Sequence, residues 1–371
     1  MKGLISRVLA GLGLFLCVEG VLFRTDLYPS ILEPDSYAGL TESFVVGGRL
    51  LSPREDRCAI LVVGHSSVFF AFSAAIANQM TQPEGFQFIN AATPISSLRS
   101  WYYQLREFDP DSDRYRAVVL PMTSYDDWHI QWTWREIDEI RLLVPLLRYT
   151  DLPTFVGSYE RPMAPRALSA VLLKGSAYRE DIQAFLQAPV RRMASVARRD
   201  ELLRETAGRL EEFQEEEAKR ENDSLAGVTY DARSDQVLFA DGLPFDEQER
   251  EDLTYSIRRM REDVAPSASF EQRWLERIVG RYSGTNTRVI LYRLPIPFPS
   301  TRPRIPAKSD SVVRSMAAQH RIVLLPEDLF VDLERPEYFS DTRHMNEQGR
   351  NRFSPILARE VARKLECNSS Y

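Results

Sequence analysis

The strongest constraint on the fold is a set of short apolar runs, each closed by a turn signal. They are rich in β-branched residues and are CAILVVG (58–64), FQFIN (86–90), RAVVLP (116–121), RVILYRLP (288–295) and RIVLLP (321–326). Continuous apolar runs of this length are typical of strands that are buried on both faces, as in a parallel sheet. Helical patterns lie between them, so we expect an α/β fold: a three-layer sandwich around a mostly parallel five-stranded sheet.

Helical periodicity supports this alternation. The segment IDEIRLLVPLLRY (137–149) has the spacing of a helix that follows the third strand. The last segment, residues 346–366, repeats apolar side chains at Ile356, Leu357, Val361 and Leu365, which predicts a final helix.

The strand rhythm stops between about residues 158 and 285. Residues 190–222 are dense in Arg and Glu, which is typical of a solvated helix. Residues 228–242 have the pattern of a small hairpin, and residues 268–282 that of an amphipathic helix. We therefore expect a mainly helical insertion at 158–285 that caps the site. It would divide an α/β domain into parts 58–157 and 286–371, after a linker at 25–57.

The N-terminus, residues 1–24, holds an apolar run behind Lys2 and Arg7. A membrane-spanning helix needs about 20 mostly apolar residues. Residues 3–23 reach that length by including Arg7 and Glu19, both near the flanks. A cleaved signal peptide is the alternative, because the apolar core is short, but no small-x-small cleavage site follows. We expect an uncleaved anchor in the lipid bilayer, with the rest of the chain outside the cytoplasm.

Charge and cysteine content narrow the functional classes. The net charge of −6 argues against a nucleic-acid-binding protein. The spacing of Cys17, Cys58 and Cys367 fits no metal site. Cys58 and Cys367 could pair only if the fold brings them together, and we expect three unpaired thiols. His129 lies beside Asp126 and Asp127 without a convincing third ligand, so neither a metal nor a cofactor is expected.

Two stretches carry candidate catalytic residues. The first predicted strand ends in VVGHSS, where Gly64 permits a tight turn and Ser66 begins the next helix. Reactive groups gather at the carboxyl ends of strands in open α/β sheets, although a serine there is also a common helix cap. Near the C-terminus, Asp341 and His344 are three residues apart. His344 could remove the proton of Ser66 while Asp341 orients the imidazole; the simpler alternative is a cap and a surface histidine.

This combination resembles the SGNH hydrolase superfamily, which is related to the GDSL esterases. The resemblance covers residues 58–126 and 286–366. GHSS at 64–67 is similar to the family's first block and SDTRHMNEQG at 340–349 to its last. The resemblance implies a flavodoxin-like fold and a triad of Ser66, His344 and Asp341.

The two middle blocks depart from the family's pattern. The second block supplies a glycine N–H to the oxyanion hole, whereas residues 89–97 (INAATPISS) contain no glycine. The third block supplies an Asn side chain, whereas Thr123 or Ser124 stands here. The oxyanion-hole candidates are therefore the N–H of Ser66, the backbone near Ala92, and Thr123 or Ser124.

Substrate-binding candidates are the polar and aromatic residues that follow the second and third strands. They are Asn90, Tyr125 and Trp128. Aromatic rings there would stack on sugars, or alternatively pack in the core or at a bilayer interface.

With its apolar N-terminus, the chain is similar in plan to tethered SGNH-like partners of membrane-bound O-acyltransferases. Those partners modify extracytoplasmic glycans, as in alginate acetylation and teichoic-acid D-alanylation. The resemblance implies a serine-dependent O-acyltransferase or esterase acting on an envelope polysaccharide, with a membrane-bound O-acyltransferase as partner. The alternative is a non-catalytic SGNH-fold subunit that binds glycan or assists assembly, which the missing block residues favour.

Overall fold

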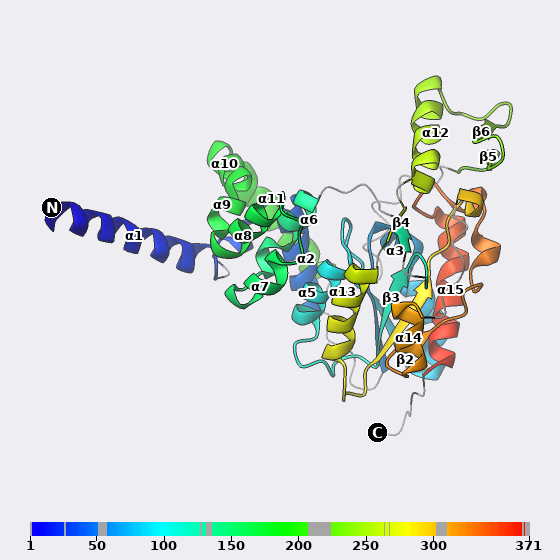
Figure 1. Cartoon of the computed structure of the whole chain (residues 1–371), viewed down its shortest axis with the longest axis horizontal. Helices are drawn as coiled ribbons and strands as arrows, with labels where there is room; N and C mark the ends of the chain where they lie inside the picture. The colour runs from blue at the N-terminus through cyan, green and yellow to red at the C-terminus, as the bar shows by residue number, and fades with distance from the viewer. Residues whose placement is uncertain are drawn as a thin grey trace. The chain divides into compact units, whose positions relative to one another are not determined.

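The computed structural model describes residues 2–25, 27–50, 58–126, 128–130, 136–206, 224–262, 264–266, 268–301, 310–365 and 367. The chain forms two compact units. Figure 1 labels their helices and strands. We call Met1–Leu50 with Trp134–Ala207 the helical unit, and Leu51–Thr133 with Gly208–Tyr371 the sheet unit.

The sheet unit is built on five parallel strands. They are β1 (Cys58–Val62), β2 (Phe86–Asn90), β3 (Ala117–Met122), β8 (Arg288–Arg293) and β9 (Val323–Leu324). Their order is β2-β1-β3-β8-β9, and each neighbouring pair is parallel. The prediction of an α/β fold with a mostly parallel five-stranded sheet is confirmed. Each strand coincides with a predicted apolar run, and only β3 extends beyond its run, by Met122.

The core sits on the central strands because their side chains are apolar on both faces. All six residues of β3 are buried, and so are four of the five residues of β1. Val62 pairs with Asn90 of β2 and with Val119 of β3, so the carboxyl ends of these strands meet at one edge. The turn after β1 therefore opens at the edge where α/β proteins hold their sites.

Helices cover both faces of this sheet. One group packs together: α3 (Ser66–Ala71), α4 (Ala74–Thr81) and α15 (Glu347–Arg363). The other group is α5 (Leu98–Phe108), α13 (Ala268–Arg281) and α14 (Val312–Ala318). The β1–β2 connection runs along the sheet in the direction opposite to the later connections. Because such connections are right-handed as a rule, it is expected on the other face, and this accounts for the separation of α3 and α4 from α5, α13 and α14. The final helix is confirmed at α15.

A small appendage follows residue 223 of the sheet unit. It contains the hairpin of β5 (Val228–Asp231) and β6 (Gln236–Phe239), which confirms the predicted hairpin, and α12 (Glu247–Glu262). A second antiparallel pair joins β4 (Trp128–Ile130) to β7 (Val264–Pro266). The expected insertion at 158–285 is thus divided: residues 158–207 belong to the helical unit, and the rest to the sheet unit.

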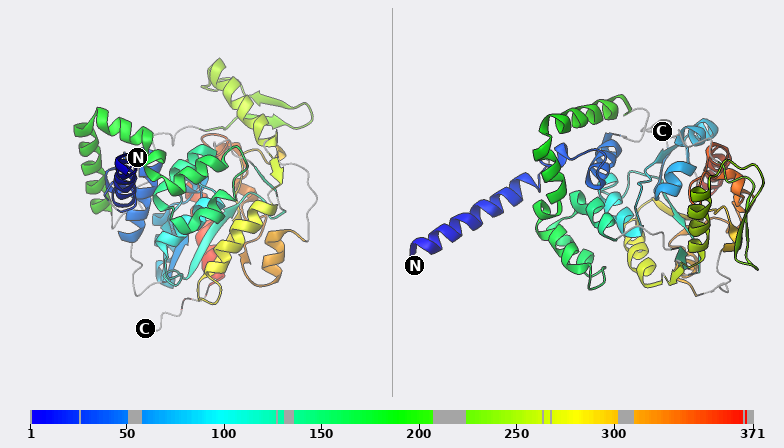
Figure 2. Two further views of the ribbon diagram at one scale, coloured as in Figure 1. Left: turned by 60° about the vertical axis from the view of Figure 1, so that its left-hand side comes forward. Right: turned by 90° about the horizontal axis from the view of Figure 1, so that it is seen from above.

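The helical unit combines two segments that are distant in sequence. It contains α1 (Lys2–Leu22), α2 (Tyr37–Leu50), α6 (Glu136–Leu143), α7 (Leu152–Val156), α8 (Ala164–Leu172), α9 (Lys174–Ala177), α10 (Arg179–Gln187) and α11 (Pro189–Thr206); Figure 2 gives two further views. The linker expected at 25–57 is wrong for residues 27–50. Leu32, Thr41 and Val45 are buried there, and α2 packs on α6.

The C-terminal end of α1 is fixed within the helical unit by Glu19. This side chain is only 3% exposed. Its two carboxylate oxygens accept hydrogen bonds from the backbone N–H groups of Lys174 (2.6 Å) and Gly175 (3.0 Å). Arg24 lies 3.5 Å from the same carboxylate. Glu19, which was expected at the flank of a membrane span, is instead part of a buried polar cluster.

Within the residues that have been placed, none of the helices reaches the combination of length and hydropathy needed to cross a bilayer. The expectation of a spanning anchor at residues 1–24 is therefore not supported by the fold.

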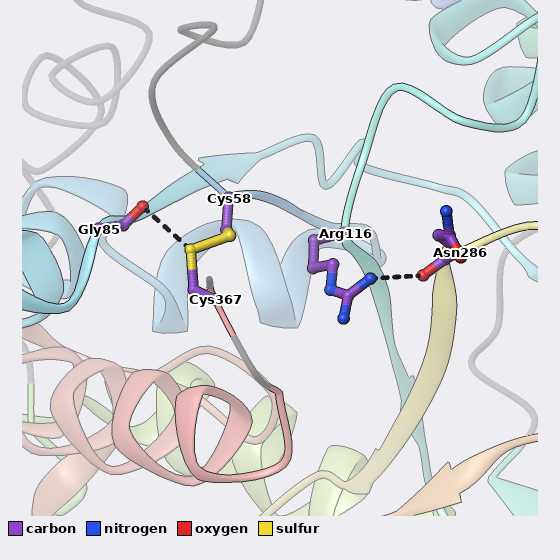
Figure 3. The surroundings of a disulfide bond; sticks show 5 residues. All are labelled: Cys58, Gly85, Arg116, Asn286 and Cys367. Carbon is purple, nitrogen blue, oxygen red and sulfur yellow. Dashed lines mark hydrogen bonds between the residues drawn. A yellow bond between two sulfur atoms is a disulfide. The ribbon is translucent and has the colours of Figure 1, made fainter. Parts of the chain in front are cut away.

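A disulfide joins the start of β1 to the chain after α15 (Figure 3). Cys58 and Cys367 are 309 residues apart, and their Cα atoms lie 6.0 Å from each other. Cys367 Sγ also lies 3.8 Å from the carbonyl oxygen of Gly85. The expectation of three unpaired thiols is wrong for these two cysteines, because the parallel topology returns the last helix to the first strand. Cys17 is a free, exposed thiol.

Candidate active site

A continuous chain of hydrogen bonds joins Ser66, His344 and Asp341. Ser66 Oγ lies 2.9 Å from His344 Nε2, and His344 Nδ1 lies 2.7 Å from Asp341 Oδ2. The structure thus brings together the three residues singled out in the sequence, although 278 positions separate the serine from the histidine. Ser66 is half-buried and the His344 side chain is 22% exposed, so the pair faces solvent.

The position of Ser66 follows from the residues around the turn after β1. Gly64 is needed because a Cβ there would overlap the side chain of Val68 and touch Pro121. The imidazole of His65 caps the next helix, since Nδ1 accepts the N–H of Ser67 at 3.2 Å. Ser66 is therefore the first residue of α3, at the carboxyl end of a central strand.

A short closed loop holds Asp341 and His344. Its ends are joined by a bridge between Phe339 and Met345, and Ser340 N–H donates to the carbonyl of His344 at 2.9 Å. Asp341 Oδ1 accepts the backbone N–H groups of Arg343 (2.7 Å) and His344 (2.8 Å). One carboxylate oxygen thus shapes the loop while the other meets the imidazole.

The start of α15 fixes this loop from the other side. Asn346 caps the helix by accepting the N–H of Gly349 at 3.0 Å, and its Nδ2 donates to the carbonyl of Glu337 at 2.9 Å. A side chain at Gly349 would overlap the carbonyl of Tyr338. The residues that follow His344 therefore serve to hold its position.

Electrostatics favour an ionised Asp341. Burial alone would raise the pKa of this carboxyl group, but the hydrogen bond and charge of His344, with two backbone N–H groups, hold it below its ordinary value. A carboxylate only accepts, so the proton of the neutral imidazole lies on Nδ1. Nε2 is then free of a proton and can accept the hydroxyl of Ser66, the arrangement that general-base catalysis requires.

His65 supports the turn and was not among the candidate site residues. Its ring stacks on Trp101, with centroids 6.3 Å apart. Burial, aided by the nearby charges of His344 and Arg343, lowers the pKa of His65 to about 3. The ring is therefore neutral at ordinary pH and keeps Nδ1 available as the cap. The available signal was its place just before a helix start, where capping acceptors occur.

A second layer of hydrogen bonds supports the turn. Trp101 Nε1 donates to Ser96 Oγ at 2.8 Å, and Ser96 Oγ lies 2.9 Å from the carbonyl of Gly64. Thr93 N–H donates to the same carbonyl at 2.8 Å. On the other side, Phe70 meets the His344 ring edge-on at 4.8 Å between centroids. The imidazole thus has one apolar wall.

The candidate donors to the oxyanion hole differ in whether they already form hydrogen bonds within the protein. The hydrogen bonds of α3 begin with Val68 and Phe69, which donate to the His65 carbonyl, so Ser66 N–H precedes them. The N–H of Ala92 instead donates to Asn90 Oδ1 at 3.0 Å. Ser124 is buried, and its hydroxyl oxygen accepts the N–H of Asp126 at 2.9 Å. Thr123, beside it, is half-buried.

Two of the three substrate-binding candidates are engaged with backbone groups of the protein itself. Asn90 bridges backbone groups, since its Nδ2 donates to the carbonyl of Phe72 at 2.8 Å and its Oδ1 accepts from Ala92. Tyr125 is 2% exposed, and its hydroxyl lies 3.1 Å from the carbonyl of Leu325. This burial, which raises its pKa, gives Tyr125 a core role instead of the expected contact with substrate. Trp128 begins β4, but its side chain lies outside the described part of the chain.

No group of three or more His, Cys, Asp and Glu side chains converges as a metal site in the part of the chain that the structure covers. No protein-family model matches this sequence. A search of curated proteins also finds no match.

Proposed function

We propose that the protein is a serine-dependent O-acyltransferase or acyl esterase that works through an acyl-enzyme on Ser66. The observation that carries this proposal is the unbroken contact from Ser66 Oγ to His344 Nε2 (2.9 Å) and from His344 Nδ1 to Asp341 (2.7 Å). A nucleophile, a base in reach of it and a carboxylate that orients the base form the arrangement typical of acyl transfer.

The steps follow from this geometry. Ser66 Oγ attacks the acyl carbonyl as its proton moves to His344 Nε2, and Asp341 stabilises the imidazolium that forms. The proton then passes to the leaving alcohol, the C–O bond to it breaks, and the acyl group remains on Ser66. In the second half, His344 takes a proton from a sugar hydroxyl or from water, and that oxygen attacks the acyl carbonyl. The bond between the acyl group and Ser66 Oγ then breaks, and His344 returns the proton to Ser66. Ser66 N–H is the proposed first donor to the oxyanion.

The resemblance to SGNH hydrolases supports this assignment. The strand order β2-β1-β3-β8-β9 is the flavodoxin-like order, with the serine after the first strand and the Asp–His loop before the last helix. We therefore propose that the sheet unit has the SGNH fold. The substrate class, an envelope polysaccharide, and the partner, a membrane-bound O-acyltransferase, are part of the same proposal.

Location outside the cytoplasm has independent support from the disulfide between Cys58 and Cys367. Disulfides persist in oxidising compartments and are rare in reducing ones. The proposal also includes contact of α1 with a lipid bilayer, because several large side chains of this helix are exposed. Among them are Leu9 (62%), Leu14 (68%) and Leu16 (57%). Exposed apolar surface of this kind is typical of a site that contacts a membrane or a protein partner.

One observation favours the second candidate, a non-catalytic subunit that binds glycan or assists assembly. The Ala92 N–H is engaged by Asn90, and Ser124 is only 2% exposed, so neither offers an evident second oxyanion donor to a bound substrate. Removing one donor costs about 100- to 1,000-fold in rate in a serine hydrolase. Thr123 is then the donor to test first.

Labelling with a fluorophosphonate separates the two candidates. Wild-type protein should label, Ser66→Ala should not, and His344→Gln should label slowly. Ser67→Ala is the matched control, because it removes the neighbouring hydroxyl but keeps the backbone N–H that His65 caps. Labelling that persists in Ser66→Ala, or is absent from folded wild type, would favour the non-catalytic subunit. Products formed from an acyl donor with and without a glycan acceptor would then distinguish transfer from hydrolysis.

A further inference from the structure

The helical unit exposes large apolar side chains on consecutive helices. At the junction of α10 and α11, Leu186 is 71% exposed, Val190 83% and Met193 49%. Leu168 and Leu172 on α8, and Leu173 just after it, are 37–40% exposed. We call these six residues the α8–α11 surface. Single exposed apolar residues are ordinary, but a group of them, such as the three at the α10–α11 junction, marks an interaction site.

The pattern on α11 has two distinct faces. Val190, Met193, Ala194 and Ala197 are exposed and recur at the spacing of one helix face. Arg192 and Val196, on the opposite side, are only 2% and 6% exposed. The helix therefore turns one face into its own unit and presents a second apolar face outward. Arg191 and Arg198 are exposed beside that outer face.

Charge indicates what covers this surface. Residues 160–199 contain eight Arg or Lys against three Asp or Glu, a net charge of +5 within a chain of −6. Five of these arginines are exposed: Arg161, Arg166, Arg179, Arg191 and Arg198. Apolar side chains interspersed with arginine are typical of helices that lie in the interface of an anionic membrane.

The same helices hold the base of α1. Glu19 accepts the N–H groups that begin α9, and Tyr28 donates to Asp181 of α10 at 2.7 Å. Arg192 of α11 pairs with that same Asp181 at 2.9 Å. The exposed apolar helix α1 and the α8–α11 surface thus belong to one hydrogen-bonded body.

We propose that the α8–α11 surface docks on an anionic lipid bilayer. Leu186, Val190 and Met193 enter the interface between headgroups and acyl chains, and Arg191 and Arg198 meet the headgroup phosphates. This contact is additional to any made by α1, and it uses no residue of the proposed triad. It extends the proposed lipid contact from one helix to a face of the helical unit.

A fluorescent probe placed on this surface tests the proposal in the full chain. Val190→Cys, in a Cys17→Ser background, leaves one free thiol besides the bonded Cys58 and Cys367. A polarity-sensitive dye on it should shift its emission to shorter wavelength with phosphatidylglycerol–phosphatidylcholine vesicles, less with phosphatidylcholine alone, and less at high salt. The matched control is Leu238→Cys on β6, which is 51% exposed and should not shift.

Substitutions that introduce negative charge provide a second measurement. Leu186→Glu with Val190→Glu should lower partitioning into anionic vesicles at least about tenfold, since burying one such side chain contributes a factor of this size. Both positions are exposed, so the melting temperature should be unchanged. Two results would overturn the proposal and leave α1 as the membrane contact. In the first, the protein sediments with vesicles while the probe at residue 190 stays in water. In the second, the wild type and the double Glu variant partition equally into anionic vesicles.

Discussion

Replacing Asp341 with Asn tests how the imidazole is held. Asp341 accepts three hydrogen bonds: from His344 Nδ1 at 2.7 Å and from two backbone N–H groups at 2.7 and 2.8 Å. In Asp341→Asn the amide oxygen keeps the two backbone bonds, and the loop should hold. The amide nitrogen then faces His344 Nδ1 as a donor, so the ring must move its proton to Nε2. That nitrogen can no longer accept the proton of Ser66.

The expected loss is large because the base is held in the wrong tautomer. The same change in a serine protease triad lowers kcat about 10⁴-fold. At about 1.36 kcal/mol per factor of ten, this corresponds to about 5.4 kcal/mol in the activation free energy. The melting temperature should change little, since the bonds that shape the loop remain. The rate loss should therefore appear without unfolding.

The assay is the rate of hydrolysis of an activated acyl ester, together with the rate of fluorophosphonate labelling at Ser66. Glu347→Gln is the matched control, because it removes an exposed negative charge two residues beyond Met345 without touching His344. Its rate should stay close to wild type. If Asp341→Asn keeps more than about a tenth of the wild-type rate, then Asp341 does not set the tautomer, and the reasoning from its geometry is refuted.

Three further predictions concern the support of the site. His65 has its pKa lowered to about 3, so the unfolded chain binds more protons between that pH and 6.5, and stability should fall as pH falls through this window. His65→Asn should retain the cap and activity and flatten this dependence in thermal melts; an unchanged slope would contradict the assignment. Gly64→Ala should cost about 1–3 kcal/mol of unfolding free energy and most labelling, because its Cβ overlaps Val68; wild-type labelling would count against it. Cys58→Ser with Cys367→Ser should lower unfolding free energy by about 2–4 kcal/mol in denaturant melts, and no loss would remove the disulfide's stabilising role.

Local pattern was enough to predict the sheet. The β1, β3 and β8 runs are apolar on both faces because each strand lies between two helix layers, and such short runs closed by turns are typical of buried strands. The same pattern predicted where strand ends meet. This placed Ser66 at an edge, and the Asp–His pair before the last helix supplied its partners.

Features that depend on long-range assembly could not be predicted from local pattern. Cys58 and Cys367 are 309 residues apart in sequence, and they pair only because α15 runs back along the first strand. α2 was taken for a linker, since its Gly and Ser content resembles a loop and its buried face is complete only with α6, about 90 residues later. Tyr125 was expected near substrate because it follows a strand, but its hydroxyl turns to carbonyls in the core.

The capping role of His65 could be predicted only in part from local pattern. Its position before a helix was visible, but histidine is not among the preferred caps. Its neutrality depends on burial against Trp101 and on the nearby charges of Arg343 and His344, which come from elements far along the chain.

The most direct measurement is to trap and map the acyl group. Protein mixed with an activated acetyl ester, quenched in acid and digested, should show acetyl mass on the peptide that contains Ser66, and none there in Ser66→Ala. Acetyl found only on another residue, or no adduct at any time in folded protein that binds the ester, would contradict a nucleophilic role for this serine.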